Sequence, residues 1–334
     1  MANSILKLNS REQRVFNALE AQNAALGTEI PIKFLTQILA EPSRQKFTQV
    51  KLSDYCKIDI GTGAWAPAVL KPLVVASAGD WDSGVIDTGS DGARMAQVTS
   101  GIGTMTFPII PWGKRMSWSI PELKKYALMN LEPIVERKWA LEKDWQTGLQ
   151  DKFFCGSTKY NLAGLLTNSQ VYTDTSVLGA NTNFGDLYDA AFQTAVVKMM
   201  TLFDNVSNRT AVPDRFVVPL SDYRKMASFT SSTYQNYTKL QYLTNMFKDQ
   251  TGNPDFKILG SPYADAGFGS LAKNRYALYN SQPDSMVFGI PVDLTFTLYN
   301  SLDNFWFNSI GYGEISGMQM YYPNQCIYFE STAS

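Results

Sequence analysis

The residues of this chain whose types and spacing could support catalysis lie between Val85 and Asp91, in the sequence VIDTGSD. An Asp-Thr-Gly turn can present its carboxylate to a second aspartate, and two aspartates that share one proton can activate a water molecule for hydrolysis. This chemistry requires two such carboxylates a few ångström apart. No further Asp-Ser/Thr-Gly follows Gly89, and Asp82-Ser83-Gly84 precedes Asp87 too closely to form an opposing half-site. The chemistry therefore lacks its second carboxylate.

The Asp87 turn resembles that of the aspartic proteases, so a hydrolase using Asp87 is kept as a minor alternative. A simpler interpretation explains the same residues. Residues 78–93 contain four Gly and four Asp and almost nothing that could pack into a core. Gly and Asp are the residues that turns prefer. We therefore expect this segment to be a turn cluster at the tip of a long β ribbon, with no catalytic role for Asp87.

The composition excludes several other kinds of chemistry. The chain contains no histidine, which removes Ser-His-Asp and Cys-His catalysis and histidine-based zinc sites together. Its cysteines, Cys56, Cys155 and Cys326, are scattered without Cys-x-x-Cys spacing, so we expect buried small hydrophobic residues and no disulfide framework. The net charge of −1 comes without a Lys/Arg cluster, which argues against sequence readout of nucleic acid. We expect no enzymatic activity, no cofactor and no metal.

The overall composition is that of a globular protein, with 45% hydrophobic and 18% charged residues. The first residues lack a basic region followed by an apolar run, and no stretch approaches the ~18 uninterrupted apolar residues of a membrane span. We therefore expect a soluble intracellular product without membrane contact.

The element that must organise these loops is a long helix predicted over 131–154. At about 100° per residue, its apolar side chains form one stripe. These are Leu131, Ile134, Val135, Trp139, Leu141, Trp145, Leu149 and Phe153. Lys138 and Glu142 have the spacing of an ion pair. We expect the stripe to pack on a β layer of the same chain, with Arg137, Asp144 and Asp151 in water or against other chains.

The rest of the chain divides by its pattern. The first fifty residues predict two short helices, around 11–26 and 33–39, in a thin arm without its own core. Residues 50–120 read as strands. From about 183 to 279 helices and strands alternate, and Asp186 is expected to cap a helix with Tyr188, Phe192, Ala195, Met199 and Leu202 on its buried face. The C-terminal part is β again, and Val292, Leu294, Phe296 and Leu298 are expected to share one face.

This order of elements, together with five local segments, resembles the major capsid proteins of tailed bacteriophages with the Hong-Kong-97-type fold. The segments are WGKRMSWSIPEL from Trp112, FFCGSTKYNLAGLLTN from Phe153, TKLQYLTNMF from Thr238, and the closing runs NRYALYNSQPDSMVFGIPVDL and GMQMYYPNQCIYFES. Two departures concern the last strand. The family's Arg before Pro323 is missing, and Glu330-Ser331 replaces its Asp-Gly. They leave the subfamily open.

The resemblance implies an α+β fold with the parts of that family. These are an N-terminal arm (1–60), an E-loop region (61–118), a P-domain (119–182) with spine helix 131–154, an A-domain (183–283), and C-terminal P-domain strands and tail (284–334). It also implies a coat protein that self-assembles, as pentamers and hexamers, into an icosahedral virion shell around the phage genome.

The same resemblance implies partners: scaffold, portal and decoration proteins, and packaged DNA without sequence readout, with assembly in the host cytoplasm. Because no scaffold-like propeptide precedes the arm, we expect a separate scaffold protein or a chain already trimmed. The expected inter-subunit contacts are Trp81, Asp82, Asp87 and Arg94, near the ribbon tip. An encapsulin-like nanocompartment shell, which would bind cargo peptides on its inner face, is the alternative within this fold.

Overall fold

The computed structural model describes residues 46–77, 99–127, 133–181, 183–228, 237–301 and 305–332. The chain separates into one unit of residues 1–45 and a second unit of residues 46–334, and all elements described below belong to the second. The two predicted arm helices fall outside the described residues. None of the described helices is long and apolar enough to cross a membrane.

The predicted long helix is present as α3, Pro133–Phe154, and a shorter helix, α2, spans Ile120–Ala127. Pro133 lies in the first turn, where no intrahelical backbone bond is lost. Behind the C-terminal end, Gly156 has φ of +63°, and a β-carbon there would collide with the backbone of residues 162–164. Glycine is therefore required where the chain turns away from the helix.

The centre and C-terminal half of the predicted stripe are confirmed, because Leu141, Trp145, Leu149 and Phe153 are buried. Val135 is exposed, contrary to the prediction, because the neighbouring Ile134 takes the position that packs on the core in the first turn. The Lys138–Glu142 pair forms, with Nζ and Oε1 3.9 Å apart.

The polar side of α3 differs in part from the prediction. Arg137 was expected in water or against other chains, but it donates to the Ser117 carbonyl and pairs with Glu122. Its length allows it to reach both β4 and α2 from the first turns of the helix. Gln150, which the pattern left unassigned, is buried, and its Oε1 accepts the Val50 N–H at 3.2 Å.

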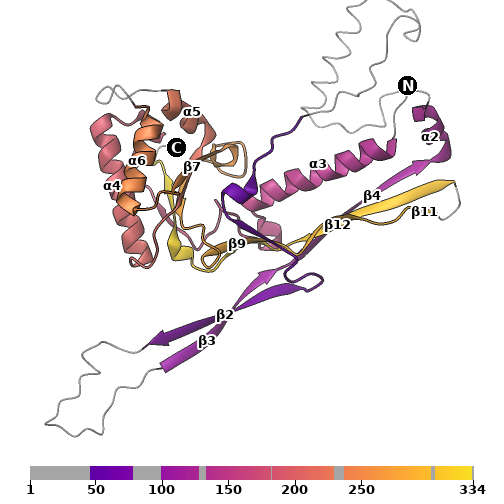
Figure 1. Ribbon diagram of the computed structural model, residues 1–334, viewed down its shortest axis with the longest axis horizontal. Helices are drawn as coiled ribbons and strands as arrows, with labels where there is room; N and C mark the ends of the chain where they lie inside the picture. Colours follow the sequence, from indigo (N-terminus) through magenta and orange to yellow (C-terminus); the bar gives the residue numbers. More distant parts are fainter. Residues whose placement is uncertain are drawn as a thin grey trace, which may run out of the picture. The chain divides into compact units, whose positions relative to one another are not determined.

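The face of α3 rests on an antiparallel sheet of β10 (Val292–Phe296), β12 (Trp306–Ile315) and β11 (Asn300–Ser301), with β4 (Ile110–Ser119) on β12 (Figure 1). The β4–β12 register pairs ten residues on each strand, from Trp306 with Ser119 to Ile315 with Ile110. β10 alternates as predicted, but Leu298 is 92% exposed. That prediction is wrong because β10 ends at Phe296 and the chain leaves the strand pattern there.

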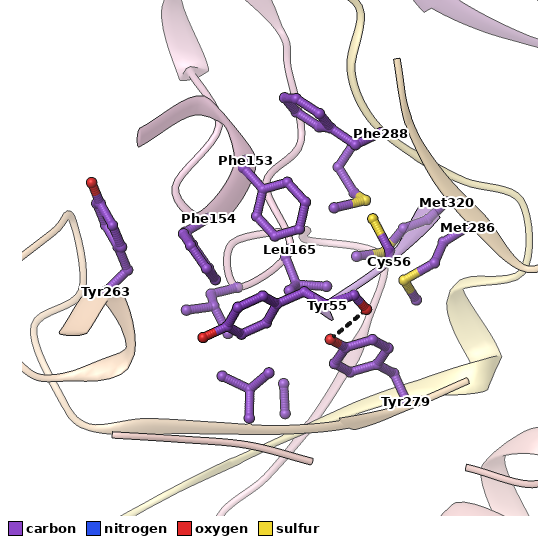
Figure 2. Close-up of a cluster of buried hydrophobic side chains, with 14 of the residues drawn as sticks. Tyr55, Cys56, Phe153, Phe154, Leu165, Tyr263, Tyr279, Met286, Phe288 and Met320 are labelled. Carbon is purple, nitrogen blue, oxygen red and sulfur yellow. Dashed lines mark hydrogen bonds between the residues drawn. The ribbon is translucent and has the colours of Figure 1, made fainter. Parts of the chain in front are cut away.

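A second, three-stranded sheet joins β1 (Lys57–Ile60), β9 (Met286–Ile290) and β13 (Gly317–Met320), with β1 parallel to β9. Residues 50–60, which the resemblance placed in the N-terminal arm, are thus anchored in the main core. Tyr55 and Cys56 are buried there, and Figure 2 shows Tyr55 among Phe153, Phe154 and Tyr279. The Tyr279 hydroxyl donates to the Tyr55 carbonyl at 3.0 Å. Aromatic contacts between residues far apart in the sequence fix this segment.

A five-stranded sheet has the strand order β5 (Tyr172–Asp174), β14 (Cys326–Glu330), β8 (Arg275–Tyr279), β6 (Arg215–Pro219) and β7 (Lys257–Ser261). Its helices are α4 (Asp189–Ser207), α5 (Leu220–Ser228) and α6 (Lys239–Thr251) (Figure 1). β14 comes from the C-terminal segment, so the alternating α/β run does not close this sheet alone. Short 3-10 turns are η2 (Leu52–Asp54), η4 (Thr158–Tyr160), η5 (Phe184–Asp186), η6 (Pro262–Ala264) and η7 (Pro323–Gln325).

This sheet separates two hydrophobic cores. On β14, Cys326 and Tyr328 point into the core beneath α3, whereas Ile327 and Phe329 point into the core beneath α4 and α6. The period-two geometry of a strand places its side chains on both faces in this way. Burial raises the pKa of the Cys56 thiol to about 12 and that of Cys326 well above its usual value. These two cysteines are buried as predicted, while Cys155 is only partly buried.

The start of α4 corrects two predictions. Tyr188 is the N-cap residue, in extended conformation and without a side-chain capping bond. Because it lies before the helix, helical periodicity does not apply to it, and it is 88% exposed. Asp186 does not cap α4; it accepts from Lys225 and from Asn183 Nδ2. Phe192, Ala195 and Met199 are buried as predicted and Leu202 is partly buried.

Candidate assembly surfaces

The predicted ribbon is present as β2 (Ala68–Ser77) and β3 (Thr99–Pro108), paired antiparallel over ten residues. Among the described strands, β2 and β3 pair only with each other. A two-stranded ribbon of this kind is only marginally stable in water. Its stability must therefore depend on what covers its faces.

The two faces of the ribbon differ. The register places Val74 opposite Ile102 and Leu70 opposite Thr106, so these side chains share one face. Leu70 and Val74 are exposed on it and Ile102 is 80% exposed. Apolar side chains that line one exposed strand face are typical of an interaction surface. The sequence identified the ribbon but not this face, because apolar residues occur at both parities along β2.

The opposite face packs against the body of the subunit at the ribbon's base. The Nζ atom of Lys71 lies 3.0 Å from the centroid of the Tyr321 ring, and Phe107 meets the same ring edge to face at 5.8 Å. Desolvation lowers the pKa of Lys71, and the nearby Asp284 opposes the shift. A cation over an aromatic face is an attractive contact. The base of the ribbon is thus held, while its other face stays open.

The predicted contact residues Trp81, Asp82, Asp87 and Arg94 lie outside the described residues. Their role as inter-subunit contacts therefore stays a prediction. The same holds for the Asp87 turn of the hydrolase alternative.

A second exposed surface lies on the sheet face opposite α3. On β12, Gly311 and Gly313 face the helix. Ile310 and Tyr312, which alternate with these glycines, face away from it. Trp65, which is 71% exposed, lies on this outer face with its ring 5.9 Å from that of Tyr312. An antiparallel sheet commonly exposes one face to water, and that face usually carries polar residues. Here the outer face carries Trp65, Ile310 and Tyr312 instead. The alternating glycines of IGYGEI were the sequence signal for this arrangement.

A cleft of about 590 Å³ lies beside α3. Aromatic residues line much of it, including Trp112, Trp145, Tyr160 and Phe268. Lys114 and Asp144, which form an ion pair at 2.5 Å, are also part of its lining. Its lining is mostly apolar but also includes a second ion pair, between Lys152 and Asp151. A mainly apolar lining with a few polar groups suits a protein segment or another apolar group.

Asp222 is a buried carboxylate, a kind of group that can support acid–base chemistry. Burial raises its pKa, and hydrogen bonds from Tyr276 and Gly185 oppose that shift. Its oxygens accept the backbone N–H groups of Phe184 and Gly185 and the Tyr276 hydroxyl, at 2.8 to 3.2 Å. These bonds tie η5 to α5 and β8. Asp222 is therefore placed as a structural carboxylate, and no cluster of metal-ligating side chains occurs among the described residues.

Comparison with known proteins bears on these surfaces. The family model described as major capsid protein matches residues 86–331. The capsid of Myoviridae phage XM1 is similar over 91% of this chain and 99% of its own, with 18% identity and a TM-score of 0.74. The structure titled Gordonia phage Cozz covers 99% of both chains at 13% identity and TM-score 0.54. The capsid of a native GTA particle covers 90% of this chain and all of its own at 12% identity and TM-score 0.57. No curated protein sequence matches the chain.

Proposed function

Because the chain belongs to the major capsid protein family and has the Hong-Kong-97-type fold, it is a coat protein that self-assembles into a virion shell, and we propose that the β2–β3 ribbon joins its copies. The observation that carries this proposal is the open apolar face of Leu70, Val74 and Ile102 on a ribbon that pairs with no other described strand. A neighbouring copy that covers this face would supply the contacts that an isolated ribbon lacks.

The ribbon tip extends the proposed contact. Trp81 would bury against a neighbour, since the Gly and Asp residues around it in the sequence offer it no packing partner. Asp82, Asp87 and Arg94 would add charged contacts at the rim, where they favour orientation more than affinity. Heterologous contacts that repeat under rotation close into a shell. The copies would form pentamers and hexamers of an icosahedral shell around the genome.

The finer organisation is proposed on the same basis. Scaffold, portal and decoration proteins would meet the shell, and assembly would take place in the host cytoplasm. Packaged DNA would be held without sequence readout, consistent with a net charge of −1. The division into arm, E-loop region, P-domain, A-domain and C-terminal strands, with the boundaries given above, is retained as a proposal, as is a purely structural role without catalysis.

Electron microscopy of the purified full-length protein tests the assembly. Closed shells or ring-shaped capsomers are expected for the wild type. The variant Ile102→Asp should reduce their yield, because it places a charge on the proposed contact. The matched control is Ile102→Val, which keeps an apolar β-branched side chain at the same position and should assemble like the wild type. Equal shell yields for Ile102→Asp and the wild type would refute the contact without refuting assembly.

The contents of the particles distinguish the phage shell from the encapsulin-like alternative. Nucleic acid within particles made during infection supports the phage shell. A reproducible protein cargo without nucleic acid would support the nanocompartment instead.

A further inference from the structure

The link between β1 and the ribbon has an unusual backbone. Between Gly61 and Pro67, three residues have positive φ: Gly61 at +97°, Gly63 at +82° and Trp65 at +66°. Glycine adopts this conformation without steric cost. A bulky side chain does not, because its β-carbon approaches the following carbonyl oxygen, so Trp65 is a true outlier. The strain at Trp65 must be held by something outside the residue itself.

The side chain of Trp65 does not provide that restraint. Its indole is 71% exposed and contacts the ring of Tyr312 only in a tilted arrangement at 5.9 Å. The restraint lies on the backbone instead, in the turn bond from the Ala66 N–H to the Gly63 carbonyl at 3.0 Å and in a bond to a distant residue. The Trp65 N–H donates to Oε2 of Glu314 at 3.0 Å, and Glu314 is buried on β12. A buried carboxylate needs a donor, so both groups gain from this bond.

The position of this bond gives it leverage over the ribbon. Before the link, the Gly61 N–H donates to the Ile290 carbonyl of β9, which fixes the chain to the core. After it, Pro67 accepts the Ile109 N–H at the foot of the ribbon. A β-carbon at Gly63 would lie 2.7 Å from Cγ2 of Val69, so the link packs closely on the start of strand β2. A change of φ at Trp65 would therefore redirect the ribbon relative to the sheet.

We propose that the Trp65–Glu314 bond is a strain-loaded latch that fixes the direction of the β2–β3 ribbon. With the bond intact, Trp65 stays in the left-handed conformation and the ribbon keeps one pose. Without the bond, Trp65 relaxes to negative φ, the start of β2 shifts against its contacts with Tyr321, and the ribbon changes direction. Strained backbone persists where the surrounding structure over-determines it, and it is typical of switch segments. The latch belongs to the single subunit and does not depend on the proposed shell contacts.

The strain is tested first, by two variants that both remove the indole. Trp65→Ala and Trp65→Gly differ in their tolerance of positive φ. At an ordinary position alanine melts higher than glycine, because glycine loses more backbone entropy on folding. At Trp65 the order should be reversed, with the glycine variant melting several degrees above the alanine variant. A higher Tm for Trp65→Ala would overturn the strain on which the latch rests.

The latch itself is tested by the ribbon's direction in unassembled subunits. Spin labels at Thr104→Cys on β3 and Gln146→Cys on α3, in a Cys155→Ser background and diluted with unlabelled protein, report this direction as a distance distribution. Glu314→Met removes the acceptor at similar volume and should broaden or shift the distribution. Glu314→Gln, which keeps an acceptor oxygen and the shape, is the matched control and should resemble the wild type.

The double variant Glu314→Met with Trp65→Gly decides the mechanism. Glycine adopts positive φ without strain, so the ribbon is no longer driven from its wild-type direction, and the mean distance should return toward the wild-type value although the bond is absent. A wild-type distribution for Glu314→Met alone, or a mean distance in the double variant that stays at the Glu314→Met value, would refute the latch. If Glu314→Met does not fold, the Trp65→Ala and Trp65→Gly melting order still decides whether strain is present.

Discussion

The indole of Trp145 lies directly on Gly313, so that a β-carbon at Gly313 would be 2.5 Å from Cη2 of the ring. Trp145 is 4% exposed, contacts Trp112 at 5.1 Å, and donates from Nε1 to Asp293 Oδ1 at 3.1 Å. The spine helix can approach β12 closely only because this strand position has no side chain. Trp145 thus contacts residues on three strands, β12, β4 and β10. A change at Trp145 therefore tests how the helix packs on the sheet.

Replacing Trp145 by alanine should lower the free energy of unfolding by about 3 to 5 kcal/mol, through lost burial and the cavity that remains. The subunit should then fail to fold, not merely fail to assemble. Thermal melts of unassembled subunits measure this. Asp144→Ala, one residue away, removes a half-exposed pair with Lys114 and should cost less than about 0.5 kcal/mol. A wild-type melt for Trp145→Ala with loss of shells alone would mean that the stripe faces a neighbour.

Gly313→Ala should destabilise the subunit by about 1 to 3 kcal/mol, because the new methyl group overlaps the Trp145 ring. In a Trp145→Leu background, which removes the overlapping ring but keeps an apolar side chain in the core, the same change should cost much less. Denaturant unfolding of the four proteins gives the coupling energy directly. Strictly additive losses would show that the two residues do not meet as described.

The stability difference between the wild type and Asp222→Asn should depend on pH. Burial raises the pKa of Asp222 above its ordinary value of 3.8, so the folded state binds the proton more tightly than the unfolded state. Stability therefore rises as pH falls through the folded-state pKa, and the gain is complete below the ordinary value. The amide introduced by Asp222→Asn cannot titrate, so the wild type should gain on the variant as the solution is acidified. Chemical denaturation at a series of pH values measures this difference. A free energy of unfolding that falls, relative to that of the variant, as the pH is lowered would contradict the prediction.

The amides of the ribbon, from about Pro67 to Met105, should exchange rapidly in unassembled subunits and slowly in shells. The proposed source of the protection is the neighbouring copies. Strand β8, which lies inside the five-stranded sheet of the subunit, should exchange slowly in both states and serves as the internal reference. Hydrogen exchange with mass spectrometry gives both. Equal protection of the ribbon before and after assembly would rule out a stabilising role for the neighbours.

Asp87→Asn should leave shell assembly nearly normal, because the chain has no second Asp-Thr-Gly to share a proton with Asp87. Assembly yield by electron microscopy and peptide cleavage by the wild type are the two measurements. Pepstatin-sensitive cleavage that disappears in the variant would revive the hydrolase.

Local pattern was enough to predict several parts of this protein. The periodicity of residues 131–154 predicted α3 and the burial of Trp145, and the alternation from Val292 to Phe296 predicted β10. The Gly/Asp cluster between two extended runs predicted a long ribbon, and β2 and β3 confirm its strands. Each of these features depends on which face of one element is apolar, and the spacing of neighbouring residues records that directly.

The partners of these elements were decided only by the tertiary structure. Tyr55 and Cys56 join the main core, and β14 inserts between β5 and β8 although its nearest sequence neighbours serve other sheets. The Trp65–Glu314 bond links residues that are 249 positions apart. A sequence pattern states that a surface must be buried but not against what, because the choice is made by competition among distant surfaces of similar hydrophobicity. Shape settles that competition, as where Gly313 makes room for Trp145, and shape exists only once the chain is folded.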